Sequence, residues 1–195
     1  MVTKIQKAAS TRANIIATAR HLFATRGYDG TSTEAVLEEA KVSRGALYHH
    51  FENKEALFAA VLEAVEVDIT AATATARANV SDPVEALCRA FNSFLDLSST
   101  AEVRQILLTD AHSGLGWQKW RAMEDRHGLG RLKQALRMIA ASGRLSEDMI
   151  DVFAHILLAS LIEVAFLVAR SPDPASEAKI GRQAMKELLE RLLRG

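Results

Sequence analysis

The sequence predicts an all-α protein, and three observations support this fold class. Only 3 of the 195 residues are proline, and the helix formers Ala, Leu, Glu and Arg are plentiful. Runs of aromatic or β-branched residues, which favour strands, are sparse. Apolar residues also recur at helical spacing, first at Ile15, Ile16, Ala19, Leu22 and Phe23. We therefore expect about nine helices in one or two small domains.

The first predicted helix ends near Arg26 and carries this first apolar stripe. Ser10 or Thr11 is expected to cap its start, since short polar side chains accept hydrogen bonds from the first free N–H groups. Gly27 stands just past its end, where glycine is favoured because it adopts a left-handed conformation without steric cost.

The second predicted helix is short, from about Thr33 to Ala40. Thr31 and Glu34 have the spacing of a capping box, and Ser32 is an equally good cap. A tight turn is expected at 41–42.

Ser43 is expected to cap a third short helix, from about Arg44 to His50, with Leu47 and Phe51 as its inward pair. Gly45 lies in the first turn of this helix, although glycine lowers helix stability by about 1 kcal/mol relative to alanine. Close packing against another helix would explain this glycine, and so would close approach to a partner molecule.

Further caps and breaks delimit the remaining helices. Asn53 caps the fourth helix, and Asp82 followed by Pro83 is a good opening for the fifth. Breaks are expected at the run HSGLG and at the pairs Ser142-Gly143 and Ser171-Pro172. The predicted ranges are about 54–77, 83–97, 102–111, 117–141, 146–169 and 174–193.

The charge distribution is asymmetric although the net charge is zero. Residues 1–57 carry eight Lys and Arg against six Asp and Glu, a net charge of +2. The first 28 residues hold five basic side chains and no acidic one. A basic arm of this kind is compatible with a polyanionic partner. The single cysteine, Cys88, excludes an internal disulfide, and its apolar neighbours indicate a small core residue.

One apolar stretch, Val152 to Ala169, is long enough to raise the question of a membrane span. His155, Ser160 and Glu163 interrupt it, so a helix buried on two faces explains it better. No secretory signal pattern is visible at the start of the chain. We therefore expect a cytoplasmic protein without a membrane partner.

Two short helices joined by a tight turn, after a longer helix, form a helix-turn-helix unit. In such units the second short helix enters the major groove of DNA with its first residues toward the bases. A residue without Cβ, here Gly45, removes bulk at that approach. Arg44 can place its guanidinium on the O6 and N7 atoms of guanine. Packing alone can also produce such a unit, so this pattern leaves both interpretations open.

Hydroxyl and basic groups at the starts of these helices complete the predicted DNA contact. Tyr48 and His49 can reach phosphates, and Lys54 opens a helix whose N-terminus already favours an anion. The candidate DNA-binding residues are Thr31, Ser32, Thr33, Ser43, Arg44, Gly45, Ala46, Tyr48, His49 and Lys54.

The run GYDGTSTEAVLEEAKVSRGALYHHFENKEAL resembles the DNA-binding domain of the TetR family of bacterial transcriptional regulators over about residues 10–57. The matching residues are Phe23, Gly27, Thr31, Ser32, Val36, Ala40, Val42, Ser43, Gly45, Leu47, Tyr48, His50, Phe51, Lys54 and Leu57. The family usually has glycine or asparagine at the turn where this chain has Lys41, which implies mild strain or an altered turn.

The resemblance implies two domains: a three-helix DNA-binding domain at 1–57 and a helical effector-binding and dimerisation domain at 58–195. It also implies a homodimer formed through the last two helices. The apolar faces of those helices supply the interface candidates, which are Leu158, Ile162, Glu163, Ala184, Met185, Leu188 and Leu192. An intramolecular core is the other explanation of these faces.

An effector pocket is expected among the helices of the second domain, because pockets are mostly apolar with a few polar groups. The lining candidates are Phe91, Phe94, Leu107, Asp110, His112, Trp117, Trp120, Met123, His127, His155 and Phe166. Trp117, Trp120 and His155 are also readable as core residues. Asp110 and His112 lack a third metal ligand at diagnostic spacing, so we expect neither a metal nor another cofactor.

These features predict a repressor that a small molecule of unknown identity releases from a palindromic double-stranded DNA operator. An activator or a ligand-independent regulator of the same fold is the first alternative. A helical protein-interaction module without DNA binding is the second. The sequence contains no nucleophile elbow, phosphate-binding loop or HExxH motif, so we expect no enzymatic activity and no catalytic residue.

Overall fold

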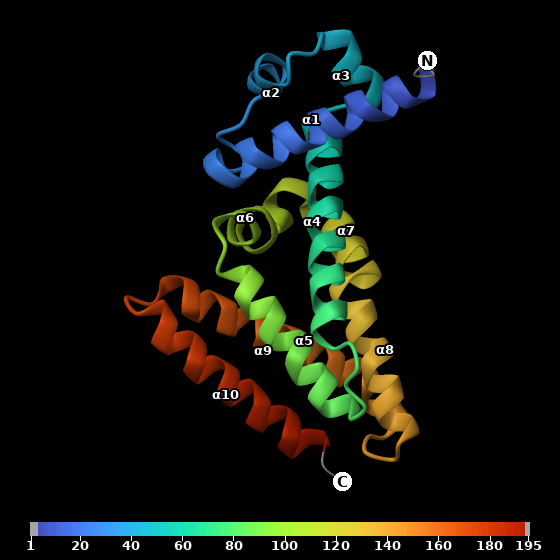
Figure 1. The fold of residues 1–195 in the computed structure, drawn as a ribbon, viewed down its shortest axis with the longest axis vertical. Coiled ribbons are helices and arrows are strands. Elements are labelled where there is room, and N and C mark those ends of the chain that lie inside the picture. The colour runs from blue at the N-terminus through green and yellow to red at the C-terminus, as the bar shows by residue number, and fades with distance from the viewer. Residues whose placement is uncertain (1–3, 194–195) are drawn as a thin grey trace. The chain divides into compact units, whose positions relative to one another are not determined.

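The computed structural model describes residues 4–193, and all regular secondary structure in that range is helical (Figure 1). The prediction of an all-α protein is confirmed. The chain forms two compact units by its internal contacts: residues 4–65 with 101–120, and residues 66–100 with 121–193. Neither unit ends at residue 57, so the predicted functional boundary between 57 and 58 stays a prediction.

The first unit contains the three N-terminal helices and a second segment of the chain that packs against them. Its helices are α1 (Lys4–Arg26), α2 (Thr33–Ala40), α3 (Arg44–His50), the first part of α4 (Lys54–Ala76), α6 (Ala101–Val103), the π-helix η1 (Arg104–Asp110) and the first part of α7 (Ala111–Arg126). Helix α1 lies against α2, α3, α6 and η1. We call α1–α3 the head.

The core of the first unit follows the predicted apolar stripes. Ile15, Ala19, Leu22 and Phe23 of α1 are buried, and the predicted inward pair of α3, Leu47 and Phe51, is buried as well. Gly27 ends α1 with a φ of 73°, which confirms its predicted place past the helix C-terminus.

The second unit is a bundle that contains α5 (Pro83–Ser98), α8 (Gly128–Ala141), the 3₁₀ turn η2 (Glu147–Met149), α9 (Ile150–Arg170) and α10 (Pro174–Leu193). Helices α9 and α10 lie side by side (Figure 1), and both also contact α5. Asp82 caps α5, as predicted, and Cys88 is a buried core residue of that helix.

Helix α9 belongs to the one stretch of the described chain, Glu147–Arg170, that is long and apolar enough to cross a membrane. A core helix of a soluble protein has the same length and composition. Ala154, Leu157, Leu161, Ala165 and Val168 of α9 are buried within the unit, while His155 and Glu163 are exposed.

The predicted start of the first helix is wrong. Helix α1 begins at Lys4, before Ser10 and Thr11, and the Thr11 hydroxyl donates to the Lys7 carbonyl within the helix at 3.0 Å. The predicted break in the run HSGLG is present at its last residue, Gly116, whose φ of 72° and ψ of 161° are not helical, while the residues before it are helical.

The predicted helix at 117–141 is divided at His127, whose φ of −110° and ψ of −99° are not helical. The cause is the glycine pair that follows, because a Cβ on Gly130 would collide with the backbone oxygen of Asp125. Only a residue without a side chain allows the chain to turn this tightly. The helix predicted at 102–111 is also altered, since most of it is the π-helix η1.

Candidate nucleic-acid interface

The predicted helix-turn-helix unit is present and its two short helices have the predicted bounds. The Ser32 hydroxyl accepts a hydrogen bond from the Ala35 N–H at 3.1 Å, and the Ser43 hydroxyl accepts one from the Ala46 N–H at 3.2 Å. Each serine therefore caps the start of its helix, as short polar residues do. The Asn14 amide donates to the Ala40 carbonyl at 2.9 Å and ties α1 to the end of α2.

The turn between the two helices has the left-handed conformation that the family pattern implies. Lys41 ends α2 with φ 54° and ψ 44°. A residue with a Cβ is strained in this region, so the departure from glycine costs stability locally. The turn itself is unaltered, because the Val42 N–H still donates to the Leu37 carbonyl at 3.3 Å.

Helix α3 has one buried and one open face. Leu47 is buried, whereas Arg44, Gly45, Tyr48 and His49 are exposed. The Arg44 guanidinium carbon lies 5.5 Å from the centre of the Tyr48 ring, so the two side chains form a cation–π pair. Tyr48 is 38% exposed, unusually open for a large aromatic side chain in a helix.

Gly45 is not required by packing within the chain. A Cβ built at this position meets no atom within 4 Å. The alternative that this glycine serves close contact between helices is therefore wrong. The other explanation from the sequence, close approach to a partner molecule, stays a prediction.

Thr31 is the one predicted DNA-binding residue that the structure removes from the surface. It is 1% exposed, and its hydroxyl donates to the Gly27 carbonyl at 2.8 Å. Its N–H donates to the Tyr28 carbonyl at 3.3 Å. Both polar groups of Thr31 are thus used to shape the turn between α1 and α2, and Ser32 alone is the cap of α2.

Two further predicted DNA-binding residues have partners within the chain. The Lys54 ammonium lies 4.1 Å from the centre of the Tyr28 ring, and the Thr33 hydroxyl lies 3.1 Å from the Glu34 carboxylate. The predicted cap Asn53 is confirmed, since its side-chain oxygen accepts from the Ala56 N–H at 2.8 Å. Ala46 is half-buried behind the open face of α3.

The predicted pocket residues are divided between the two units. The first unit contains Leu107, Asp110, His112, Trp117 and Trp120, and the second contains Phe91, Phe94, Met123, His127, His155 and Phe166. In the first unit, the Trp117 and Trp120 rings lie 5.2 Å apart and both contact His112. Trp117 is 56% exposed, so it is not a core residue. The effector pocket stays a prediction.

Asp110 has a role that the sequence did not indicate. Its carboxylate accepts hydrogen bonds from the Tyr28 N–H at 2.7 Å and from the Gln105 side chain at 3.1 Å. This predicted pocket residue is therefore bound to the turn that follows α1.

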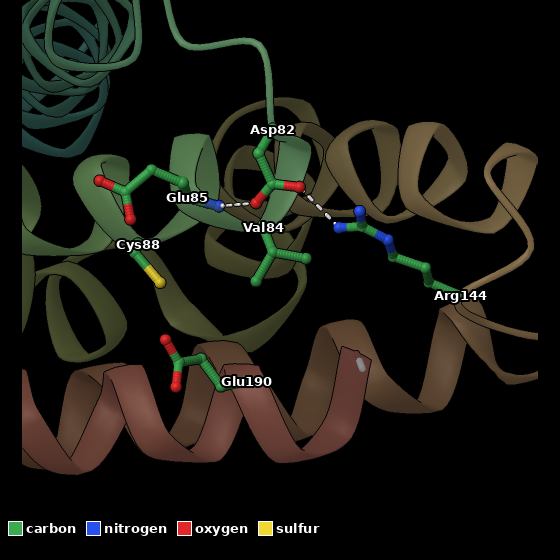
Figure 2. Close-up of a pocket in the computed structure, with 6 residues that line it drawn as sticks. All are labelled: Asp82, Val84, Glu85, Cys88, Arg144 and Glu190. Carbon is green, nitrogen blue, oxygen red and sulfur yellow. Dashed lines mark hydrogen bonds and ion pairs between the residues drawn. The ribbon is translucent and has the colours of Figure 1, made fainter. Parts of the chain in front are cut away.

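The second unit has a small surface hollow of about 90 Å³ beside Cys88 (Figure 2), which the sequence did not suggest. Its lining residues are Asp82, Val84, Glu85, Cys88, Arg144 and Glu190. Pockets for drug-sized ligands usually measure about 300–1,000 Å³, so this hollow is too small for such a ligand.

The charged groups around the hollow stabilise one another. Asp82 accepts from the Glu85 N–H at 2.9 Å and pairs with Arg144 at 2.6 Å. These two contacts, the backbone hydrogen bond first, lower the pKa of Asp82. Burial, assisted by Glu85 and Glu190, raises the pKa of the Cys88 thiol to about 11, so this thiol is not activated as a nucleophile.

The predicted interface residues of α9 and α10 are only partly available. Met185 is 3% exposed and packs inside its own chain, so it offers no open surface, and the predicted interface stays a prediction. Glu163, Ala184 and Leu188 are exposed, and Leu158, Ile162 and Leu192 are half-buried. The same two helices expose further apolar residues that were not predicted, which are Val152, Ile156, Leu167 and Ile180. On α9, Ile156 follows Val152 by four residues and Leu167 follows Ile156 by eleven, which is about three helical turns; this spacing was the available signal.

Among the described residues, no three His, Cys, Asp or Glu side chains come together in a way that would hold a metal ion.

An all-helical chain that presents an exposed second helix of a helix-turn-helix unit defines a class: the helix-turn-helix transcriptional regulators. Comparison with family models gives the particular family. Residues 15–61 match the model described as "Bacterial regulatory proteins, tetR family". Residues 84–192 match "Tetracyclin repressor-like, C-terminal domain". The chain belongs to the TetR family and is a DNA-binding transcriptional regulator.

Individual relatives agree with this assignment. The chain is 30% identical to the HTH-type transcriptional repressor NicS of Pseudomonas putida, over 81% of this chain and 76% of NicS. It is also 30% identical to the HTH-type transcriptional regulator TtgR of Pseudomonas putida, over 86% of both chains. A crystal structure of a TetR-family regulator from Pectobacterium atrosepticum matches with a TM-score of 0.78 and 30% identity, over 98% of this chain and 97% of that chain.

Proposed function

We propose that this protein is a repressor that binds a palindromic operator as a homodimer and is released by a small-molecule effector. The open face of α3 carries the proposal, since Gly45 has no neighbour within 4 Å and Arg44 and Tyr48 are exposed beside it. In this proposal the protein is cytoplasmic and its head binds the DNA. Residues 58–195 bind the effector and the partner subunit, and no catalytic step is assigned to the chain.

The contacts on α3 follow from the chemistry of its exposed side chains. Arg44 at the start of the helix presents two parallel N–H groups that match the O6 and N7 acceptors of guanine. The Tyr48 hydroxyl, one turn later, donates to a phosphate oxygen. Gly45 lies between them, and its missing side chain lets the backbone approach the groove. Ser32, Ser43 and His49 are exposed for further phosphate contacts.

Repression is supported by the relatives, since NicS is named as a transcriptional repressor. An activator with the same head would read DNA in the same way. The two are separated by the transcription of a reporter gene placed behind the bound DNA, which a repressor lowers when no effector is present.

Release by an effector needs a connection between the two units, and α4 supplies one. Its residues 54–65 belong to the first unit and residues 66–76 to the second. To change a 1:99 equilibrium of two states into 99:1, an effector must prefer one state by about 5.5 kcal/mol. A ligand-independent regulator would show no such preference.

Binding is tested with DNA duplexes selected from a random library by the wild-type protein. We expect Arg44→Ala to lose about 1–3 kcal/mol of binding free energy, because it removes a contact to guanine. Tyr48→Phe should lose less, since only one hydroxyl is removed. The matched control is Arg137→Ala, which removes an exposed arginine from α8 in the second unit.

The selection also tests the alternative of a protein-interaction module. Such a module would enrich no duplex, and its affinity for DNA would be the same with and without Arg44. For the effector, each compound that raises the melting temperature of the protein is added to the complex with the selected duplex. If the duplex stays bound in the presence of every such compound, release by an effector is wrong.

A further inference from the structure

The π-helix η1 is the structural feature that the proposed function leaves unexplained. It extends over Arg104–Asp110, and the Thr109 hydroxyl donates to the Arg104 carbonyl, five residues back, at 3.0 Å. Short π-helical turns are rare and frequently occur at functional sites. This turn ends at Asp110, a carboxylate that is 9% exposed.

The π-helical turn brings together two side chains that an α-helix would separate. Gln105 and Asp110 are hydrogen-bonded to each other at 3.1 Å. In an α-helix, residues five apart point about 140° away from each other around the axis. The wider turn places both on one face, so the Gln105 amide holds the Asp110 carboxylate in place.

This carboxylate is bound to the head through its backbone. The Tyr28 N–H donates to Asp110 Oδ2 at 2.7 Å. Directly before it stands Gly27, where a Cβ would lie 3.2 Å from the Gln105 amide nitrogen and 3.5 Å from Asp110 Oδ2. The positive φ of Gly27 favours glycine at this position, and a Cβ there would also press on the end of the Gln105 side chain.

Tyr28 is in turn fixed by the core of the first unit. Its ring centre lies 5.9 Å from that of Phe23 on α1 and 4.8 Å from that of Phe58 on α4. Lys54 at the start of α4 lies over the same ring at 4.1 Å. A displacement of the Tyr28 backbone would therefore also displace α1 and the start of α4.

Two ion pairs accompany this contact. Arg20 of α1 pairs with Glu102 of α6 through nitrogens at 2.9 and 2.5 Å, and Lys119 of α7 pairs with Glu55 of α4. Their side chains are partly or fully exposed, and exposed ion pairs contribute little. The partly buried, charge-assisted hydrogen bond of Asp110 is the stronger connection.

We propose that Asp110 and Gln105 are positioning residues for DNA binding, and that they set the orientation of the head on the segment 101–120. This inference rests on the proposed function, because head orientation matters only when two heads must reach two half-sites. A return of the turn to α-helical geometry would carry Asp110 about 100° around the axis and release Tyr28. The π-helical turn is thus the element that holds the Asp110 carboxylate on the Tyr28 N–H.

The test compares duplexes with different half-site spacing. Wild-type protein first selects a palindromic duplex from a random library, and a second duplex is made with one base pair inserted at its centre. The insertion moves the half-sites apart by about 3.4 Å and rotates them by about 34°. An isolated half-site duplex measures the affinity of one head.

We expect wild-type protein to bind the original palindrome at least about tenfold more tightly than the lengthened one, a difference of about 1.4 kcal/mol. Asp110→Ala should reduce the ratio of the affinities for the original and the lengthened palindrome toward one, and Gln105→Ala should reduce it less. Affinity for the isolated half-site should stay within about twofold, because α3 is untouched. Amide hydrogen exchange at Tyr28 should become faster in Asp110→Ala, since its N–H loses the acceptor.

Matched variants separate positioning from damage to the fold. The Tyr28 N–H and the Gln105 amide both donate to the same atom, Asp110 Oδ2. Asp110→Asn keeps one oxygen that can accept both hydrogen bonds, so the spacing preference should survive. Asp125→Ala removes an exposed carboxylate of α7 and should change nothing. Asp110 is buried, so Asp110→Ala could fail to fold. In that case Gln105→Ala gives the same test, since the Gln105 side chain is only half-buried.

The inference is overturned if Asp110→Ala or Gln105→Ala folds and keeps the full wild-type preference for the original spacing. It is also overturned if Asp110→Ala loses affinity for the half-site as strongly as for the palindrome. Failure of the proposed function is a different result, in which the wild-type protein itself selects no duplex.

Discussion

Gly45 is the residue at which folding and DNA binding make opposite demands. A helix in isolation favours alanine at this position, and nothing inside the chain opposes a methyl group there. A DNA groove against the first turn of α3 would oppose it, because a Cβ would stand between backbone and base edges.

We therefore expect Gly45→Ala to raise the free energy of unfolding by up to about 1 kcal/mol and to weaken binding to the selected duplex. Urea unfolding and a DNA titration of the same preparation measure the two effects. A variant that is stabilised and binds DNA as tightly as the wild type would show that the open space at Gly45 has no function in DNA binding.

Cys88 gives a prediction about pH, because burial raises its pKa to about 11 from an ordinary value of 9.0. The folded state favours the neutral thiol, so its contribution to stability is fully present below pH 9. As the pH rises from 9 to 11, the unfolded chain loses this proton first, and the free energy of unfolding falls.

The comparison variant is Cys88→Ala, which has no thiol to titrate. The difference in unfolding free energy between wild type and variant should be constant up to about pH 8.5. As the pH then approaches 10.5, the free energy of unfolding of the wild type should fall relative to that of the variant. A difference that stays constant across this whole range would contradict the assigned environment of Cys88.

The packing of α9 against α10 depends on a single glycine. Gly181 of α10 is buried, and a Cβ there would lie 2.5 Å from Val164 Cγ1 of α9. Real Cβ atoms essentially never approach another heavy atom this closely. Either the Val164 side chain must rotate or the two helices must separate if this position gains a side chain.

We expect Gly181→Ala to lower the free energy of unfolding by about 1–3 kcal/mol, the usual cost of overpacking, despite the better helix propensity of alanine. In a Val164→Ala background the same change should cost much less, because the obstructing methyl group is gone. Urea unfolding of the four proteins gives the coupling energy. Equal costs in both backgrounds would show that Val164 does not set the distance between the helices.

The proposed homodimer is a property of the whole molecule, and exposed apolar residues on its last two helices support it. Helix α9 exposes Val152, Ile156 and Leu167, and α10 exposes Ile180 and Leu188. Apolar residues at helical spacing on an open surface are typical of interfaces between subunits. Met185 and Leu189 of α10 point the other way, into the chain's own core.

We expect Ile180→Glu combined with Leu188→Glu to convert dimer into monomer, because two charges would have to be buried in the interface. Sedimentation equilibrium measures the change, and the monomer should keep its helical circular dichroism. Met138→Glu on α8 is the matched control, since it adds a charge at another exposed apolar position. If both proteins remain dimers, the interface lies elsewhere.

The short helices of the head were predictable because their signals are local. Ser32, Ser43, Asn53 and Asp82 each accept a hydrogen bond from an N–H three residues further along the chain. A cap of this kind is complete within one turn of helix, so a reader of the sequence sees both partners. The apolar stripe of α1 was predictable for the same reason.

The contacts that the sequence did not reveal join residues that are distant in the chain. Asp110, predicted only as a pocket residue, also binds Tyr28, which lies 82 positions away. By sequence pattern, Thr31 and Ser32 were equally good caps for α2. The structure buries Thr31, whose hydroxyl lies 3.2 Å from the Leu22 carbonyl of α1. Met185 belongs to a broad apolar face of α10, part of which is buried in the core and part exposed. Its neighbours in the sequence do not indicate whether Met185 is buried or exposed.

The sequence by itself determined the helical fold class, the bounds of α2 and α3, and the residue types at the start of α3 that point to DNA. These depend on interactions within one helical turn. Only the tertiary structure decided that Thr31 and Met185 are buried, that Gly45 has an open side, and that a π-helical turn connects Asp110 to the head. Burial and long-range partners are set by how distant segments pack, and local sequence does not contain that information.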